Sequence, residues 1–191
     1  MCLEIHAEEW SKMGYRLFSD MTADVSDELM AGMPTVEFVP MQVKVGDESY
    51  IYGPEGDLTV EHFYAEQRGG RFASTSQINP MVYRECFEKA LKAGEDVLYL
   101  CFSSGMSGTL QSANLCAQEL REDYPERKVV VVDTLCASVG EAMLVREAAR
   151  MQQEGLSIDE LAAWVEKNRL KICHWFTVDT FEHLRHGGRV S

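Results

Sequence analysis

Two short apolar runs, residues 97–102 and 129–132, constrain the fold more than any other feature of the chain. Neither run alternates apolar and polar residues, so neither leaves a face for water. Strands that are apolar on both faces are typical of the middle of a parallel sheet with helices on each side. Elsewhere, runs rich in β-branched or aromatic residues alternate with segments of helical period. This order predicts an α/β fold, a mostly parallel sheet flanked by helices on both faces, with the two runs at its centre.

Local signals place the other elements. Two helices have recognisable starts, the pair Asn79-Pro80 and the capping box made by Ser157 and Glu160. Residues 46–50 are expected to form a turn and a returning edge strand. The predicted strands are 15–19, 36–45, 96–102, 128–133 and 172–178, and the predicted helices are 60–67, 79–93, 107–122, 138–154 and 161–168.

These elements divide the chain into three parts. Residues 1–13 are expected to form an N-terminal extension, and residues 14–170 a single α/β domain. Residues 171–191 hold a strand pattern followed by the turn-forming sequence Gly187-Gly188-Arg189, so the chain either stops at a loop or is part of a longer protein.

Composition excludes several classes of function. The formal net charge is −13, which disfavours nucleic-acid binding because that binding depends on Lys and Arg neutralising phosphates. No apolar run approaches the roughly 20 residues of a transmembrane helix. The first ten residues lack the basic start and apolar centre of a secretory signal, so we expect a cytoplasmic protein. Six cysteines without a CxxC pair are expected to be core thiols rather than disulfides or zinc ligands, and no cofactor is expected.

The loop after the third predicted strand, residues 103–109, is the first candidate site. Ligands of such sheets bind beyond the carboxyl ends of the strands, at helix N-termini that offer free N–H groups. The loop holds four hydroxyl side chains and two glycines, a composition that suits an anion. A purely structural role, with Ser107 capping the helix, accounts for the loop equally well. It contains no lysine and does not complete a GxSxG elbow, so it is neither a P-loop nor a hydrolase nucleophile.

Two further hydroxyl-rich loops, residues 19–24 and 74–77, fall at similar places. Within the first, Asp20 and Asp24 form a candidate carboxylate pair for acid/base or Mg²⁺ chemistry. Aspartate is also among the commonest turn and capping residues, and that interpretation is favoured.

Four segments, 19–24, 74–77, 103–113 and 184–191, together resemble in kind, order and spacing the DegV family of bacterial fatty-acid-binding proteins. The resemblance covers about residues 15–191. It implies a Rossmann-like N-terminal domain within a two-domain α/β protein that holds a long-chain fatty acid between its domains. It also implies that residues 171–191 begin a second domain whose remainder is absent. Two differences stand out: Met21 occupies a position where the family pattern has a basic or small residue, and the family continues well beyond the Gly-Gly-Arg motif. The implied ligand-binding residues are Thr75 with Ser103 or Ser104 as carboxylate donors, supported by Ser76, Gly105, Ser107, Asp20 and Thr22.

The resemblance implies a carrier rather than an enzyme, one that presents the fatty acid to a separate kinase for phospholipid synthesis. A clamp of hydroxyls and backbone N–H groups suits a carboxylate on an apolar tail, because hydrogen bonds offset the cost of desolvating the charge. One alternative is a metal-dependent enzyme acting on a small phosphorylated or carboxylated metabolite, with Asp20 and Asp24 as metal ligands. Another is an interaction module whose acidic surface favours a basic partner protein.

Overall fold

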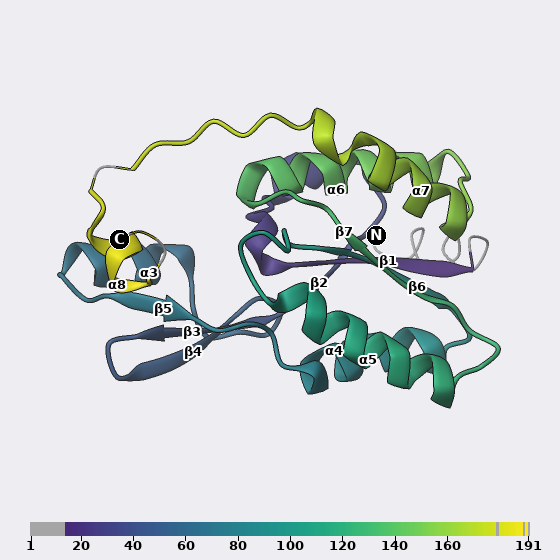
Figure 1. The fold of residues 1–191 in the computed structure, drawn as a ribbon, viewed down its shortest axis with the longest axis horizontal. Coiled ribbons are helices and arrows are strands. Elements are labelled where there is room, and N and C mark those ends of the chain that lie inside the picture. Colours follow the sequence, from purple (N-terminus) through teal and green to yellow (C-terminus); the bar gives the residue numbers. More distant parts are fainter. Residues whose placement is uncertain (1–13, 179, 189, 191) are drawn as a thin grey trace, which may run out of the picture.

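The chain is described by a computed structural model over residues 14–178, 180–188 and 190. Its main sheet has four parallel strands in the order β2-β1-β6-β7 (Figure 1). The predicted α/β fold is therefore confirmed, whereas the extension predicted over residues 1–13 lies outside the described residues. The strands are β1 (Tyr15–Asp20), β2 (Glu37–Val39), β6 (Asp96–Cys101) and β7 (Val129–Asp133).

Helices cover both faces of this sheet. Figure 1 shows α6 (Ser138–Gln153) and α7 (Ile158–Asn168) on one side, and α4 (Pro80–Lys92) and α5 (Thr109–Asp123) on the other. Each side has its own buried hydrophobic cluster. Of the two apolar runs, β6 is central, but β7 is an edge strand among the described residues, which corrects our expectation. It is apolar because α5 and α7 cover its two faces.

A second, antiparallel sheet in the order β4-β3-β5 forms the other lobe (Figure 1). The single strand predicted over residues 36–45 is wrong, because it divides at Pro40 into β2 and β3 (Met41–Val45). Proline lacks the N–H that a continuous ladder needs, so the chain changes sheets there. The predicted returning strand is confirmed as β4 (Glu48–Tyr52), whereas the short β5 (Ala73–Thr75) was not predicted. Helix α3 (Val60–Arg68) packs Phe63 against the small core of this lobe.

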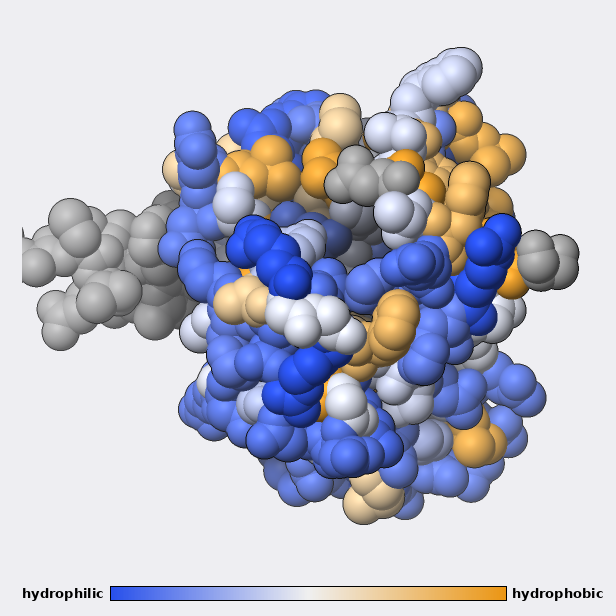
Figure 2. Space-filling view, turned by 90° about the vertical axis from the view of Figure 1, so that its left-hand side faces the viewer, coloured by the Kyte–Doolittle hydropathy of each residue, from blue (hydrophilic) through white to orange (hydrophobic). Residues whose placement is uncertain are grey.

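The strand predicted over residues 172–178 is wrong. These residues form an extended connection with no strand beside them among the described residues, so their backbone has no ladder to join. Two of its side chains, Trp175 and Phe176, are 94% and 86% exposed. Figure 2 views the molecule from the side of the second lobe and shows hydrophobic residues gathered in the upper part of a largely hydrophilic face.

The chain then returns to the second lobe as the short helix α8 (Glu182–His186), which lies beside α3 (Figure 1). Two imidazoles of α8 pack on Phe72, with ring-centroid distances of 4.9 Å for His183 and 4.4 Å for His186. The predicted domain boundary at residue 170 stays a prediction. The remaining short elements are η1 (Met21–Ala23), α2 (Asp27–Met30) and η2 (Arg169–Lys171). None of the helices in the described residues is long and apolar enough to cross a membrane.

Candidate functional site

Asp20, at the carboxyl end of β1, is fully buried and saturated with hydrogen bonds. One carboxylate oxygen accepts from the Tyr99 hydroxyl at 2.6 Å and from the Phe102 N–H at 3.2 Å. The other accepts from the Thr22 N–H at 3.0 Å and from the Thr22 hydroxyl. Four donors stabilise its charge without any help from outside the protein. Asp20 therefore ties the end of β6 to the loop after β1, which is a bracing role within the protein.

Glu141, in the first turn of α6, lies buried beside this carboxylate. Burial raises its pKa well above the usual range, and the nearby charge of Asp20 raises it further. Both effects favour the protonated, neutral form of Glu141. Its Oε2 lies 3.1 Å from the Thr22 hydroxyl oxygen. The Thr22 hydroxyl thus lies between the two carboxyl groups, within hydrogen-bond distance of both Asp20 and Glu141.

Glu141 could not be recognised from the sequence as a buried residue. Ser138 and Glu141 have the spacing of a capping box, which predicts a surface contact at a helix start. In the structure the Ser138 hydroxyl instead donates to Asp24 at 2.7 Å, and Glu141 turns inward. Both partners of that bond have left-handed backbone angles, φ 48° at Asp24 and φ 50° at Ser138. In the part of the chain that the structure describes, no three His, Cys, Asp or Glu side chains gather as metal ligands.

The serine loop between β6 and α5 satisfies most of its own hydroxyls. Ser104 donates its hydroxyl to Asp133 at 2.5 Å and its N–H to the same carboxylate at 3.2 Å. Ser103 is buried and accepts from the Gly105 N–H at 3.3 Å. The Ser107 hydroxyl oxygen lies 2.9 Å from that of Thr109, at the start of α5. The loop thus already binds one carboxylate, that of Asp133.

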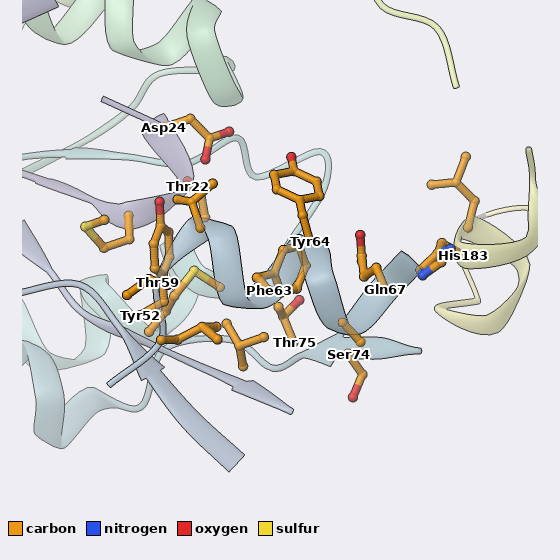
Figure 3. A pocket seen from close by; sticks show the side chains of 17 residues that line it. Thr22, Asp24, Tyr52, Thr59, Phe63, Tyr64, Gln67, Ser74, Thr75 and His183 are labelled. Atoms are coloured by element: carbon orange, nitrogen blue, oxygen red, sulfur yellow. The ribbon is translucent and has the colours of Figure 1, made fainter. Parts of the chain in front are cut away.

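A cavity of about 330 Å³ lies beside this edge of the main sheet, within the second lobe (Figure 3). The register of the second sheet explains its wall, because Val43 pairs with Thr75 and Met41 pairs with Tyr52. Directly paired residues point to the same face of a sheet, here toward α3. Most of the lining is apolar, with hydroxyls at intervals. The lining residues are Met21, Thr22, Asp24, Met41, Val43, Tyr52, Leu58, Thr59, Val60, Phe63, Tyr64, Gln67, Ala73, Ser74, Thr75, His183 and Leu184.

Two of the predicted ligand-binding residues, Thr22 and Thr75, line this cavity. The other six, Asp20, Ser76, Ser103, Ser104, Gly105 and Ser107, are not among its lining residues. The structure nevertheless brings two of the predicted loops together. The side-chain oxygen of Gln77 lies so close to Gly108 that a Cβ there would be only 2.3 Å away. The loop after Thr75 therefore lies against the serine loop, and a side chain at position 108 would have to displace the Gln77 amide.

The residues that form the other walls of the cavity were not predicted from the sequence. Phe63, Tyr64 and Gln67 come from α3, and His183 and Leu184 come from α8, more than a hundred residues later in the chain. Tyr64 is half exposed, and the mixture of polar and aromatic residues along α3 resembles an ordinary surface helix. His183 and Leu184 belong to a segment whose turn chemistry was noticed, but not its return to the second lobe.

Comparison with known proteins shows which family has this sequence and fold. The sequence profile of the DegV family matches residues 15–191. The chain belongs to the DegV family. One relative, DegV domain-containing protein CPE0026 of Clostridium perfringens, is 39% identical over 175 residues, which are 92% of this chain and 60% of the relative. Another, DegV domain-containing protein YteA of Lactococcus lactis, is 36% identical and covers 93% and 61%. The chain thus spans about 60% of the length of these DegV relatives.

Solved DegV structures share the fold. A Thermus thermophilus DegV family protein, whose structure is described as fatty acid binding, has a TM-score of 0.75 and 36% identity over 93% of this chain and 61% of that one. Protein TM841 of Thermotoga maritima, described as revealing fatty acid binding function, has a TM-score of 0.76 and 29% identity over 94% and 64%. The Fak B3 protein of Streptococcus pneumoniae, loaded with linoleic acid, is 19% identical over 94% and 62%, with a TM-score of 0.75, a likeness of fold alone.

Proposed function

We propose that this chain is the part of a lipid carrier that holds a long-chain fatty acid, with the acyl chain in the cavity beside α3 and the carboxylate at Thr75 and the serine loop. The observation that carries the proposal is the cavity itself, whose mostly apolar walls include the hydroxyls of Thr22 and Thr75. The fatty acid binding described for the Thermus thermophilus and Thermotoga maritima family members supports it.

The lining chemistry favours a mainly apolar ligand. Val43, Leu58 and Phe63 provide aliphatic and aromatic surface, and burying an acyl chain against it gains about 25 cal/mol for each Å² removed from water. The volume of about 330 Å³ is within the range of small-molecule pockets. Among the described residues, neither lysine nor arginine lines the cavity, so a carboxylate there would depend on hydroxyl and N–H donors.

Protonation of Glu141, which its raised pKa favours, makes this end of the sheet more tolerant of an anion. A charged Glu141 would stand beside the carboxylate of Asp20 and add a second negative charge close to the cavity. With Glu141 protonated and Asp20 fully hydrogen-bonded, their repulsion of an incoming carboxylate is reduced. Asp24 remains on the cavity wall and opposes the binding of anions at that point.

The test is a titration of delipidated protein with hexadecanoate, followed by calorimetry. Thr75→Val keeps the shape of the side chain and removes its hydroxyl. We expect roughly 10- to 100-fold weaker binding, since a hydrogen bond to a charged group contributes roughly 1.5–3 kcal/mol. Thr177→Val, in the exposed connection before α8, is the matched control and is expected to bind as the unmodified protein does. Flat titrations with acids of several chain lengths would rule the proposal out.

The second part of the proposal concerns what happens to the bound fatty acid. The chain presents it to a separate fatty-acid kinase, which phosphorylates the carboxylate. The resemblance of the four loop motifs supports this step. It is tested by adding a fatty-acid kinase, ATP and the protein loaded with hexadecanoate, and measuring acyl phosphate. Product that forms at the same rate with free hexadecanoate would contradict presentation by this chain, even if the chain binds the acid.

A further inference from the structure

Ser104 already holds a carboxylate, that of Asp133, by two donors. The hydroxyl donates to one oxygen of Asp133 at 2.5 Å, and the backbone N–H donates to the other at 3.2 Å. The second oxygen also accepts from the Leu135 N–H at 3.1 Å. Asp133 is the last residue of β7, the neighbour of β6 in the sheet, so the two strand ends fix this contact. The donors of the serine loop therefore converge at a distance and angle suited to a carboxylate.

The same two donors cannot serve a second carboxylate while Asp133 keeps them. A serine hydroxyl has a single hydrogen, and the backbone N–H also has one. A ligand carboxylate that takes the hydroxyl of Ser104 must therefore displace one oxygen of Asp133. It must also approach a fixed negative charge within a few ångströms, and like charges so close repel each other appreciably near a protein surface. The Arg169 guanidinium donates to the backbone carbonyl oxygen of Asp133. Among the described residues it makes no hydrogen bond to the Asp133 carboxylate.

Hydrogen bonds and one close side-chain contact connect the serine loop with residues of the cavity wall. Phe102, two residues earlier, donates its N–H to Asp20, and Asp20 accepts from Thr22 on the cavity wall. On the other side, Gln77 contacts Gly108 at the end of the serine loop, two residues beyond Thr75. Ser104 itself is exposed, so its donors are accessible from solvent. The serine loop, the loop after Thr75 and the cavity wall at Thr22 therefore meet at the same edge of the main sheet.

We propose that Asp133 is an internal competitor for the serine loop, a residue that sets the affinity for the ligand by occupying the donors of Ser104. This inference rests on the proposed function and adds to it the residue that lowers the affinity for the fatty acid. In a carrier that must release its cargo, a competing carboxylate lowers the affinity without altering the donors themselves. Asp133 was not among the residues that the sequence singled out.

The test is Asp133→Asn. An asparagine keeps one oxygen to accept the N–H groups of Ser104 and Leu135, so the local turn is retained. It loses both the charge and the acceptor for the Ser104 hydroxyl. We expect hexadecanoate to bind at least tenfold more tightly to this variant in calorimetry. Asp159→Asn is the control, and it changes the net charge by the same amount. Asp159 lies in the first turn of α7, where its carboxylate pairs with Lys128.

A double variant separates competition from a general charge effect. In a Ser104→Ala background no hydroxyl remains to compete for, so adding Asp133→Asn should give less than a threefold gain. An unchanged or weaker affinity of Asp133→Asn alone would overturn the inference, as would an equal gain in the Ser104→Ala background. Asp133→Ser offers a second test if the asparagine variant does not fold by circular dichroism. If the unmodified protein and the Asp159→Asn control also fail to bind, the proposed function fails, and the inference with it.

Discussion

Glu141 offers a quantitative test of the buried network. Its pKa is raised above the ordinary value of 4.5, chiefly by burial. Between pH 4.5 and the folded-state pKa, the folded protein therefore holds one proton more than the unfolded chain at this site. The free energy of unfolding then falls as pH rises, by about 1.4 kcal/mol per pH unit for one proton. The contribution of Glu141 is fully present below pH 4.5 and is lost as pH increases toward its folded-state pKa.

Glu141→Gln removes this titration but keeps the shape and an oxygen that can accept from the Thr22 hydroxyl. We expect the variant to match the unmodified protein near pH 4.5 and to become more stable at higher pH. The difference should grow by about 1.4 kcal/mol per pH unit for as long as Glu141 stays protonated in the folded protein.

The assay is urea unfolding at several pH values between 4.5 and 7.5, followed by circular dichroism, with the free energy of unfolding extrapolated to water. Glu126→Gln is the control, because Glu126 is exposed on the loop before β7. That variant should show the same pH dependence as the unmodified protein. Parallel pH profiles for Glu141→Gln and the unmodified protein would refute the claim that Glu141 is buried as a neutral acid.

Three further substitutions probe the scaffold, each by urea unfolding. Tyr99→Phe removes the buried donor to Asp20 and should cost about 1–3 kcal/mol; a cost near zero would contradict a bracing role for Asp20. Asn79→Ala removes the side chain that accepts the Met81 N–H at the start of α4 and should cost about 1 kcal/mol, whereas Gly at this position should cost less. Phe87→Ala empties a fully buried site against Phe18 and should cost about 3–5 kcal/mol.

The parts of the fold that the sequence predicted well are those where local pattern and tertiary burial agree. The apolar run that became β6 needs helices on both faces wherever it lies, and the caps at Asn79 and Ser157 depend only on nearby residues. Pro40 also carries a local signal, because proline inside a strand pattern argues for a break, but the prediction of one strand over residues 36–45 did not use it. The strand predicted over residues 172–178 is wrong because residues with strand propensity form a strand only when a neighbouring strand is present to pair with them.

The candidate site was harder to predict because its walls are distant in sequence. Thr22 and Thr75 belong to hydroxyl-rich segments that the family resemblance singles out, and both line the cavity. The raised pKa of Glu141 could not be predicted, because its burial and the neighbouring charge of Asp20 exist only in the folded chain. Likewise, the bond between Ser104 and Asp133 depends on the register of β6 and β7, which no local pattern reports.

The central claim, an acyl chain in the cavity with its carboxylate toward the serine loop, is tested most directly by one crystal structure. The ligand is hexadecanoic acid carrying bromine on its terminal carbon, so that anomalous scattering locates the methyl end without ambiguity. We predict one bromine peak inside the cavity, beside Phe63 or Leu58, and continuous density from it toward Thr75. A peak on the exposed Trp175 and Phe176, with none in the cavity, would contradict the account.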